Sequence, residues 1–340
     1  MKAETLAVLS CPVCGDSEAL SFTGEPWHDE EIGNGVLACS KCDISYPVKD
    51  GIPDLIREPS KTVQSERAAY AESKRGILNR INGLSPKRRT DELLHIASME
   101  HTGEQFQDTS RINLNGMLKM IHPEPGQRLL ELGAGSGWLT CSWASLGYRC
   151  VATDISADLK LELSPLLMDR EHVYFDRIVA DMTRLPFGQV FDVVFVSASL
   201  HHAEDLYLSI SEGARVLRPG GMFVIINEPM HGFIRRSGKH FIDQAAEDNP
   251  GINEQSFNYL QWRNAFRKVQ LNPEYSFPPY YRSMLSTTCE SENASSFKKI
   301  ASCLWRSPLK RIVLSKPGML ISQLILGMNV CVIARKKTIS

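Results

Sequence analysis

The sequence RLLELGAGSGWLT, from Arg128 to Thr140, decides the fold of this chain. It begins with apolar residues and one acid, as a short buried strand does, and then turns through Gly133, Gly135 and Gly137. Glycine adopts positive φ at low cost and leaves the main chain bare for a ligand to approach. The apolar residues after the last glycine predict a helix whose first N–H groups point outward. The stretch therefore predicts a strand, a ligand-binding turn and a helix.

The spacing of the glycines narrows the kind of ligand. The dinucleotide-binding fingerprint is G-x-G-x-x-G and places a pyrophosphate on the helix N-terminus. Here the third glycine comes one residue early, and Trp138 stands where the fingerprint has glycine. The E-x-G-x-G-x-G pattern that starts at Glu131 instead resembles motif I of the class I S-adenosylmethionine (SAM) methyltransferases. A plain strand-to-helix connection is the alternative that one motif leaves open.

Further segments follow motif I in the order that this family shows. Residues 150–154 form an apolar run ending in Asp154, near the offset at which an acid meets ribose hydroxyls in nucleotide-binding α/β folds. Residues 178–182 contain a second acid, Asp181, in the place of the family's adenine-binding motif. An apolar run then ends at Ser197, and LRPGG at 217–221 precedes another apolar strand. Five matches in this order favour the family over a chance turn.

The resemblance implies a set of cofactor-binding residues that come from separate strand ends. They are Glu131, Gly133, Ala134, Gly135, Gly137, Asp154, Ile155, Asp181, Met182 and Ser197.

Strands alternate with helical segments, which predicts an α/β, Rossmann-like, doubly wound parallel sheet. Right-handed crossovers place all the strand C-termini at one edge, where such folds bind ligands. The resemblance adds a seventh, antiparallel strand, expected at 330–334, and a sixth near 276–280. The methyltransferase domain is expected over 105–340. An aromatic insertion at about 230–318 is expected to form a lid or an acceptor pocket.

Two C-x-x-C pairs mark the head of the chain. Cys11 with Cys14, and Cys39 with Cys42, suit two knuckles whose four thiolates bind one ion. A redox C-x-x-C would be single and would lie beside a βαβ unit. We therefore expect a closed tetrahedral site for Zn²⁺, or for an iron that substitutes for it.

The residues after the second cysteine pair contain YPVKDGIPDL, in which Asp50 and Gly51 are a hairpin signal. Together with the cysteines this pattern resembles the small zinc-ribbon family of tRNA-methyltransferase activator proteins. The resemblance covers residues 1–57 and implies a structural zinc with no ligand position left open. Residues 58–104 are polar and charged and are expected to form a linker with one or two short helices, their basic residues on a solvated face.

Composition limits the class of protein. The chain has 340 residues, 43% of them hydrophobic, and a net charge of -1, which gives no overall attraction to nucleic acid. The N-terminus lacks a signal-peptide pattern, and no apolar run is long enough to span a bilayer. We expect a cytoplasmic protein, in which the nine cysteines are not a disulfide framework.

Methyl transfer is an in-line displacement, and a base is needed only if the nucleophile carries a proton. His201 and His202 follow the fourth strand and are candidate bases, although either could instead pack or cap a helix. Glu228 ends the fifth strand and could orient the acceptor, or could instead be a loop acid bonded to backbone amides. We expect a SAM-dependent enzyme that methylates oxygen or carbon of a small or conjugated metabolite. The alternatives are a zinc-ribbon RNA base methyltransferase and a non-catalytic protein that recruits a partner.

Overall fold

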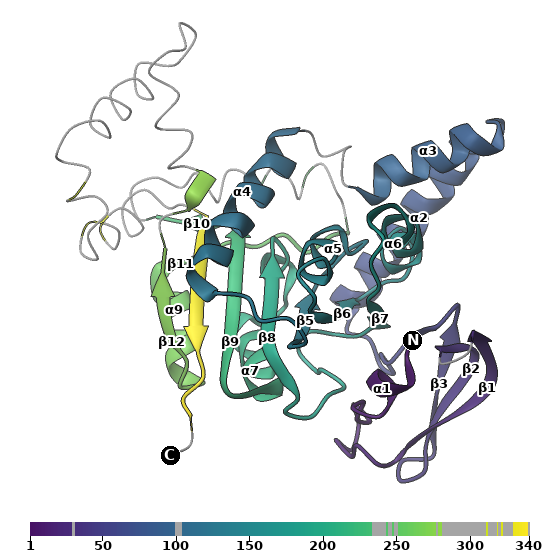
Figure 1. Cartoon of the computed structure of the whole chain (residues 1–340), viewed down its shortest axis with the longest axis horizontal. Helices are drawn as coiled ribbons and strands as arrows, with labels where there is room; N and C mark the ends of the chain where they lie inside the picture. Colours follow the sequence, from purple (N-terminus) through teal and green to yellow (C-terminus); the bar gives the residue numbers. More distant parts are fainter. Residues whose placement is uncertain are drawn as a thin grey trace, which may run out of the picture.

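A small N-terminal sheet lies beside one edge of a larger mixed sheet in the computed structural model of the chain (Figure 1). The structure describes residues 1–28, 31–98, 104–232, 251–276, 278–280 and 329–338, and the single residues 243, 247, 311, 318 and 321. Most of the expected insertion at 230–318 lies outside the described residues, so the lid stays a prediction.

The large sheet has the order β12-β13-β9-β8-β5-β6-β7. Its strands β5 to β9 pair in parallel, and β13 runs antiparallel to β9 and to β12. The chain moves outward from β5 to β7 and then returns to β8 on the other side of β5. The strand order therefore reverses between β5 and β8, as predicted for a doubly wound sheet. The strands are β5 (Arg128–Leu132), β6 (Arg149–Asp154), β7 (Asp176–Val179), β8 (Phe191–Ser197), β9 (Leu217–Glu228), β12 (Asn272–Tyr275) and β13 (Val330–Arg335).

The seventh strand lies where it was expected, but the position expected for the sixth strand is wrong. The sixth strand is Asn272–Tyr275, not 276–280. Its sequence, NPEY, contains a proline and polar residues, which argue against a strand in most positions. Pro273 is tolerated because β12 is an edge strand, where a missing N–H costs no ladder bond with a further strand.

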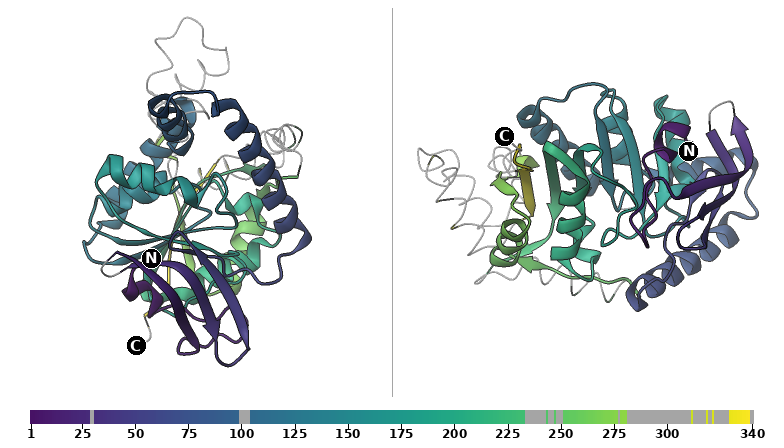
Figure 2. Two further views of the ribbon diagram at one scale, coloured as in Figure 1. Left: turned by 90° about the vertical axis from the view of Figure 1, so that its right-hand side faces the viewer. Right: turned by 90° about the horizontal axis from the view of Figure 1, so that it is seen from below.

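Alternate residues of the central strands pack into two hydrophobic cores, one on each face. Helices lie on both sides of the large sheet (Figure 2). Leu130 of β5 packs with residues of α7 and α9, whereas its neighbour Leu129 packs with residues of α4, α5 and α6. The sheet is therefore covered on both faces. These helices are α4 (Glu104–Ile121), α5 (Trp138–Ala144), α6 (Ser164–Glu171), α7 (Leu206–Val216) and α9 (Tyr259–Lys268).

The head is a four-stranded antiparallel sheet, β1 (Leu20–His28), β2 (Glu31–Cys39), β3 (Ile44–Lys49) and β4 (Ile52–Pro53), preceded by the short helix α1 (Ala3–Leu6). The predicted hairpin signal joins β3 to β4. Asp50 and Gly51 both have positive φ, 51° and 71°. A Cβ on Gly51 would also approach the amino nitrogen of Met1 to 2.8 Å, so the turn requires glycine on two counts.

The head is docked on β7 and on the loop that follows it. The N–H of Leu55 donates to the carbonyl of Val179 at 2.9 Å, and the N–H of Ser10 donates to Pro186 at 2.9 Å. Leu9 and Tyr46 of the head belong to the same hydrophobic core as Phe187. The head and the large sheet therefore share one core.

The polar segment after the head is more ordered than the sequence predicts. It forms α2 (Lys61–Ile81), a helix of 21 residues, and α3 (Pro86–Ala97). The expectation of a solvated basic face is wrong for two residues. Arg67 donates to both carboxylate oxygens of Asp54 at 3.0 and 2.9 Å and to the carbonyl of Ile155 at 2.6 Å. Lys74 pairs with acids of the segment that follows β6. These contacts fix α2 across the carboxyl end of β6.

None of the helices in the described parts of the chain combines the length and the hydrophobicity that a bilayer crossing requires. The seven described cysteines are all unbridged.

Candidate functional site

A cleft opens at the carboxyl ends of the parallel strands, next to the point where the strand order reverses. The space between its walls, open solvent included, is about 1070 Å³. Ten of the residues selected from the sequence line it: Glu131, Gly133, Ala134, Gly135, Asp154, Ile155, Asp181, Met182, Ser197 and His202. Gly137, His201 and Glu228 are not among the lining residues.

The three glycines of the turn serve different geometric needs, although all have positive φ (63°, 60° and 82°). A Cβ on Gly133 would lie 2.4 Å from the Cβ of Ser199, so this glycine lets the turn approach the end of β8. A Cβ on Gly137 would lie 2.4 Å from a ring carbon of Phe175, behind the cleft. Gly135 has nothing closer than the side chain of Lys160 at 4.0 Å, so its surface is the bare one.

The acids at the strand ends are held by backbone N–H groups and hydroxyls. Asp154 accepts from the N–H of Gly135 at 2.9 Å, which ties the end of β6 to the glycine turn. Asp181 accepts from both the N–H and the hydroxyl of Thr183. Each carboxylate has further lone pairs for a ligand's hydroxyl or amine. Burial raises the pKa of Glu131 to about 8, and its carboxyl accepts from the hydroxyl of Thr140 in α5.

Glu228 lies behind the cleft and has a local structural task. Its carboxylate accepts from the N–H groups of Ser199, Leu200 and His201 and contacts Nδ1 of His201 at 3.0 Å. It therefore fixes the 3₁₀ turn η3 (Leu200–His202). The side chain is fully buried, so Glu228 acts on the position of the two histidines.

Of the two histidines, only His202 lines the cleft. Its Nδ1 lies 2.8 Å from the carbonyl of Asn253, which can only accept. Burial, and after it the charge of His201, lower the pKa of His202 to about 3. Burial also acts to lower the pKa of His201, but the hydrogen bond and charge of Glu228 outweigh it and raise that pKa.

The cleft residues that the sequence does not single out include Glu66 and Tyr70 of α2, and Lys160 after β6. Glu66 is 3% exposed and accepts from the N–H of Asn253 at 2.8 Å. Burial raises its pKa to about 7. The Nζ atom of Lys160 lies 4.4 Å from the ring centroid of Tyr70. No local pattern singles out Glu66, because it is one of many charged residues in the 58–89 segment.

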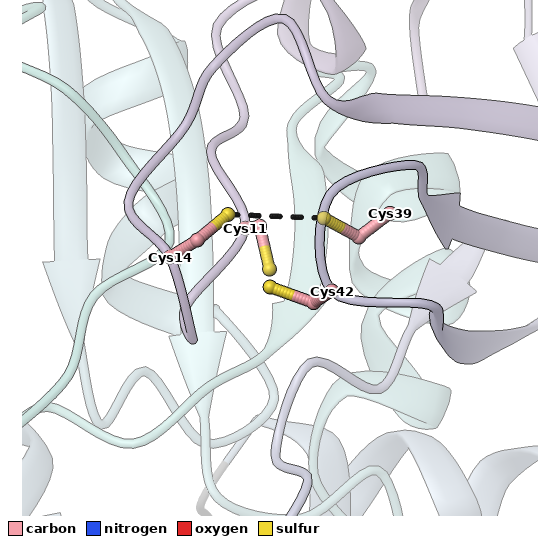
Figure 3. A group of neighbouring side chains, drawn as sticks. All are labelled: Cys11, Cys14, Cys39 and Cys42. Atoms are coloured by element: carbon pink, nitrogen blue, oxygen red, sulfur yellow. Dashed lines mark hydrogen bonds between the residues drawn. The ribbon is translucent and has the colours of Figure 1, made fainter.

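The four cysteines of the head converge from two loops (Figure 3). Their Sγ atoms all lie within 4.8 Å of one another, with Cys14 and Cys39 3.8 Å apart. Hydrogen bonding with Cys14, together with burial, raises the pKa of Cys42 to about 12. A divalent cation would remove this cost by stabilising the thiolates, and four thiolates are the usual donor set of structural zinc. The donor set fits zinc.

Residues 130–225 match the family model described as a methyltransferase domain, and residues 2–51 match the one described as Trm112p-like protein. The chain contains a methyltransferase domain. The match to this domain begins in β5 and ends in β9, and it includes the glycine turn and the two aspartates that line the cleft, Asp154 and Asp181. The match to the Trm112p-like family ends in the turn between β3 and β4, so it includes all four clustered cysteines.

Curated relatives match part of the chain around the methyltransferase domain. Demethylmenaquinone methyltransferase of Mycolicibacterium gilvum is 33% identical over 124 residues, which are 36% of this chain and 51% of the relative. The protein of the same name from Mycobacterium marinum is 37% identical over 102 residues, 30% of this chain and 41% of the relative. The matches thus span about half or less of these relatives.

Among solved structures, phosphoethanolamine N-methyltransferase 2 of Haemonchus contortus, in complex with S-adenosyl-L-methionine, superposes with a TM-score of 0.50 at 19% identity. The superposition covers 87% of this chain and 63% of the other. This likeness concerns the fold.

Proposed function

We propose that the chain is a SAM-dependent methyltransferase that methylates oxygen or carbon of a small or conjugated metabolite. The observation that carries the proposal is the convergence of the glycine turn, Asp154 and Asp181 on one open cleft at the strand-order reversal. A non-catalytic recruiting protein would not need these groups to keep an open cleft. The names of the two demethylmenaquinone methyltransferases support a small acceptor.

In this proposal, different residues of the cleft bind different parts of the cofactor. Asp154 is placed to accept hydrogen bonds from ribose hydroxyls, and Asp181 with Met182 to hold adenine. Gly135 lets the methionine part lie against bare main chain. When bound, SAM supplies an activated methyl group on a positively charged sulfur. The chain then has to align the acceptor, exclude water and take a proton.

Two groups of the cleft can accept that proton or orient the acceptor. Glu66 is buried, lines the cleft and has a pKa of about 7, the range in which a general base works at neutral pH. We propose Glu66 as the base. His202 has a pKa of about 3 and is therefore neutral, so the ring nitrogen that does not bond to Asn253 keeps a lone pair for a ligand of the cleft. His201 and Glu228 position His202 from behind.

The RNA alternative gains no support from the basic residues beside the cleft. Arg67 and Lys74 of α2 are engaged in ion pairs with acids of this chain. Phosphate binding relies on clustered cations that are available to the ligand.

We propose that Cys11, Cys14, Cys39 and Cys42 bind a structural zinc ion. The support is the closed donor set, in which four thiolates complete a tetrahedral site and leave no position for water. The ion would stabilise a head whose own core is small and which otherwise depends on the core that it shares with the large sheet.

The cofactor assignment predicts that Asp154→Ala weakens SAM binding by about 1–3 kcal/mol, because charge-assisted hydrogen bonds to the ribose are lost. Isothermal titration of the purified chain with SAM measures the change. Asp169→Ala is the matched control, since Asp169 is exposed on α6 and does not line the cleft. Equal SAM affinity in the two variants would refute the role of Asp154. A screen of transfer from labelled SAM to metabolite and RNA pools would identify the acceptor.

A further inference from the structure

A second cluster of metal-ligating side chains lies at the edge of the cleft. One ring nitrogen of His201, one of His202 and a carboxylate oxygen of Glu254 all lie within 4.8 Å of one another. Nε2 of His201 is 3.5 Å from Oε2 of Glu254. His202 also lines the cleft, so the cluster borders the space assigned to cofactor and acceptor.

The carboxylate of Glu254 is buried without a full complement of partners. Its side chain is 8% exposed, and among the described residues Oε2 accepts no hydrogen bond. A buried carboxylate oxygen without a partner is costly, and such groups usually pair or coordinate a cation. Oε2 lies 3.5 Å from Nε2 of His201, and the other oxygen, Oε1, lies 4.0 Å from Nδ1 of His202.

The surrounding groups hold both histidines as metal ligands are held. Nδ1 of His201 meets the carboxylate of Glu228 at 3.0 Å, and Nδ1 of His202 meets the carbonyl of Asn253 at 2.8 Å. Histidine ligands of metals usually donate their other ring N–H to a carboxylate or a backbone carbonyl, which fixes the tautomer and leaves the remaining nitrogen with its lone pair. Both kinds of partner are present here.

The charges also favour a divalent ion over a simple ion pair. Glu228 and Glu254 bring two carboxylates against His201, whose ring lies beside that of His202 with centroids 4.1 Å apart. One imidazolium balances only one of the two acids, and a second imidazolium would be repelled by the first. A divalent cation balances both carboxylates while the imidazoles stay neutral.

We propose that His201, His202 and Glu254 bind a divalent first-row transition-metal ion beside the cleft. Two histidines and one carboxylate leave coordination positions open, as in catalytic metal sites. Resting on the proposed function, the inference adds that the acceptor presents an oxygen to this ion, as an enol, a phenol or a hydroxyl beside a carbonyl does. The metal–oxygen bond stabilises the deprotonated acceptor, and the proton passes to a base of the cleft.

A titration with Mn²⁺ tests the site separately from the cysteine cluster. Thiolates select softer ions, whereas imidazole and carboxylate ligands accept Mn²⁺. In the full chain with its head loaded with zinc, electron paramagnetic resonance of free Mn²⁺ should report about one bound ion per chain. Glu254→Gln and His202→Gln should each weaken Mn²⁺ binding at least about tenfold. His95→Gln, on the exposed side of α3, is the matched control and should bind as the unaltered chain does.

The outcomes separate this inference from the proposed function. Absence of Mn²⁺ binding, or equal binding by Glu254→Gln, His202→Gln and His95→Gln, overturns the site and leaves an ion pair between His201 and the two acids. Should a variant fail to fold, Co²⁺ added to the unaltered zinc-loaded chain decides: visible absorption without a thiolate charge-transfer band supports the site, and no absorption overturns it. SAM binding is measured on the same samples. A chain that binds Mn²⁺ but not SAM keeps the metal site and loses the methyltransferase assignment.

Discussion

Removing the metal from the cysteine cluster should unfold the head and also weaken SAM binding in the cleft. Structural zinc contributes on the order of 10 kcal/mol of apparent folding free energy in small zinc modules. The docked head supports the strand and loop that carry the adenine end of the cleft, since Leu55 bonds to Val179 and Ser10 to Pro186. Ala180 to Thr183, between these two contacts, line the cleft. Unfolding of the head would therefore leave this side of the cleft without support.

Metal analysis, limited proteolysis and SAM titration of the Cys14→Ser variant measure the effect. We expect loss of about one zinc per chain, rapid cleavage within the first 57 residues and weaker SAM binding. Cys141→Ala is the control, because this buried thiol of α5 is distant in sequence from the head and should leave metal content unchanged. A metal-free head that still resists protease would rule out the zinc site. Unchanged SAM affinity after the head is digested would show that the cleft wall stands without it.

Glu66→Gln should lower kcat/KM by about 10²–10⁴-fold above pH 7, because the amide cannot take a proton. The pKa of about 7 means that Glu66 is neutral below this pH and ionised above it. Only the carboxylate acts as a base, so kcat/KM of the unaltered chain should rise with pH through about 7. The variant should lose this rise. The measurement is a pH profile of kcat/KM with the acceptor found by the labelled-SAM screen.

Glu204→Gln is the matched control for Glu66. Glu204 also lines the cleft, but hydrogen bonding with Thr62 lowers its pKa, so it stays ionised across the neutral range. Its replacement should leave the pH profile in place. The pH dependence of the unfolding free energy is a second test. Glu66 binds its proton more tightly in the folded chain than in the unfolded chain, so the unfolding free energy falls as pH rises from 4.5 to about 7. That slope should shrink in Glu66→Gln. An unchanged pH–rate profile would remove Glu66 as the base.

The cofactor side of the cleft could be predicted from the sequence because its chemistry is local. Each acid follows an apolar strand, and the carboxyl ends of parallel strands must share an edge. Backbone positions that need positive φ can be recognised in the sequence because glycine occupies them. Hence Asp154, Asp181 and Gly135 were selected from the sequence and lie together in the structure.

The acceptor side could not be predicted in this way. Glu66 reaches the cleft only because Arg67 and Lys74 fix α2 to residues far along the chain, and neither contact leaves a periodic signal. Glu254 meets His201 through a segment 53 residues later, again by tertiary packing alone. The two interpretations of Glu228, a group that orients the acceptor or an acid bonded to backbone amides, could not be separated for a related reason. An acid at a strand end looks like a ligand group, but here the turn of η3 encloses it.

The bridge between Asp54 and Val179 covers the outer edge of β7 and so affects whether the chain self-associates. Without the head, β7 would be an outer strand with unsatisfied N–H and C=O groups, a template on which a second molecule can add its own strand. By occupying that border, the head protects the chain against self-association. A shortened chain that starts after the head should therefore precipitate as its concentration increases, even where its core is intact.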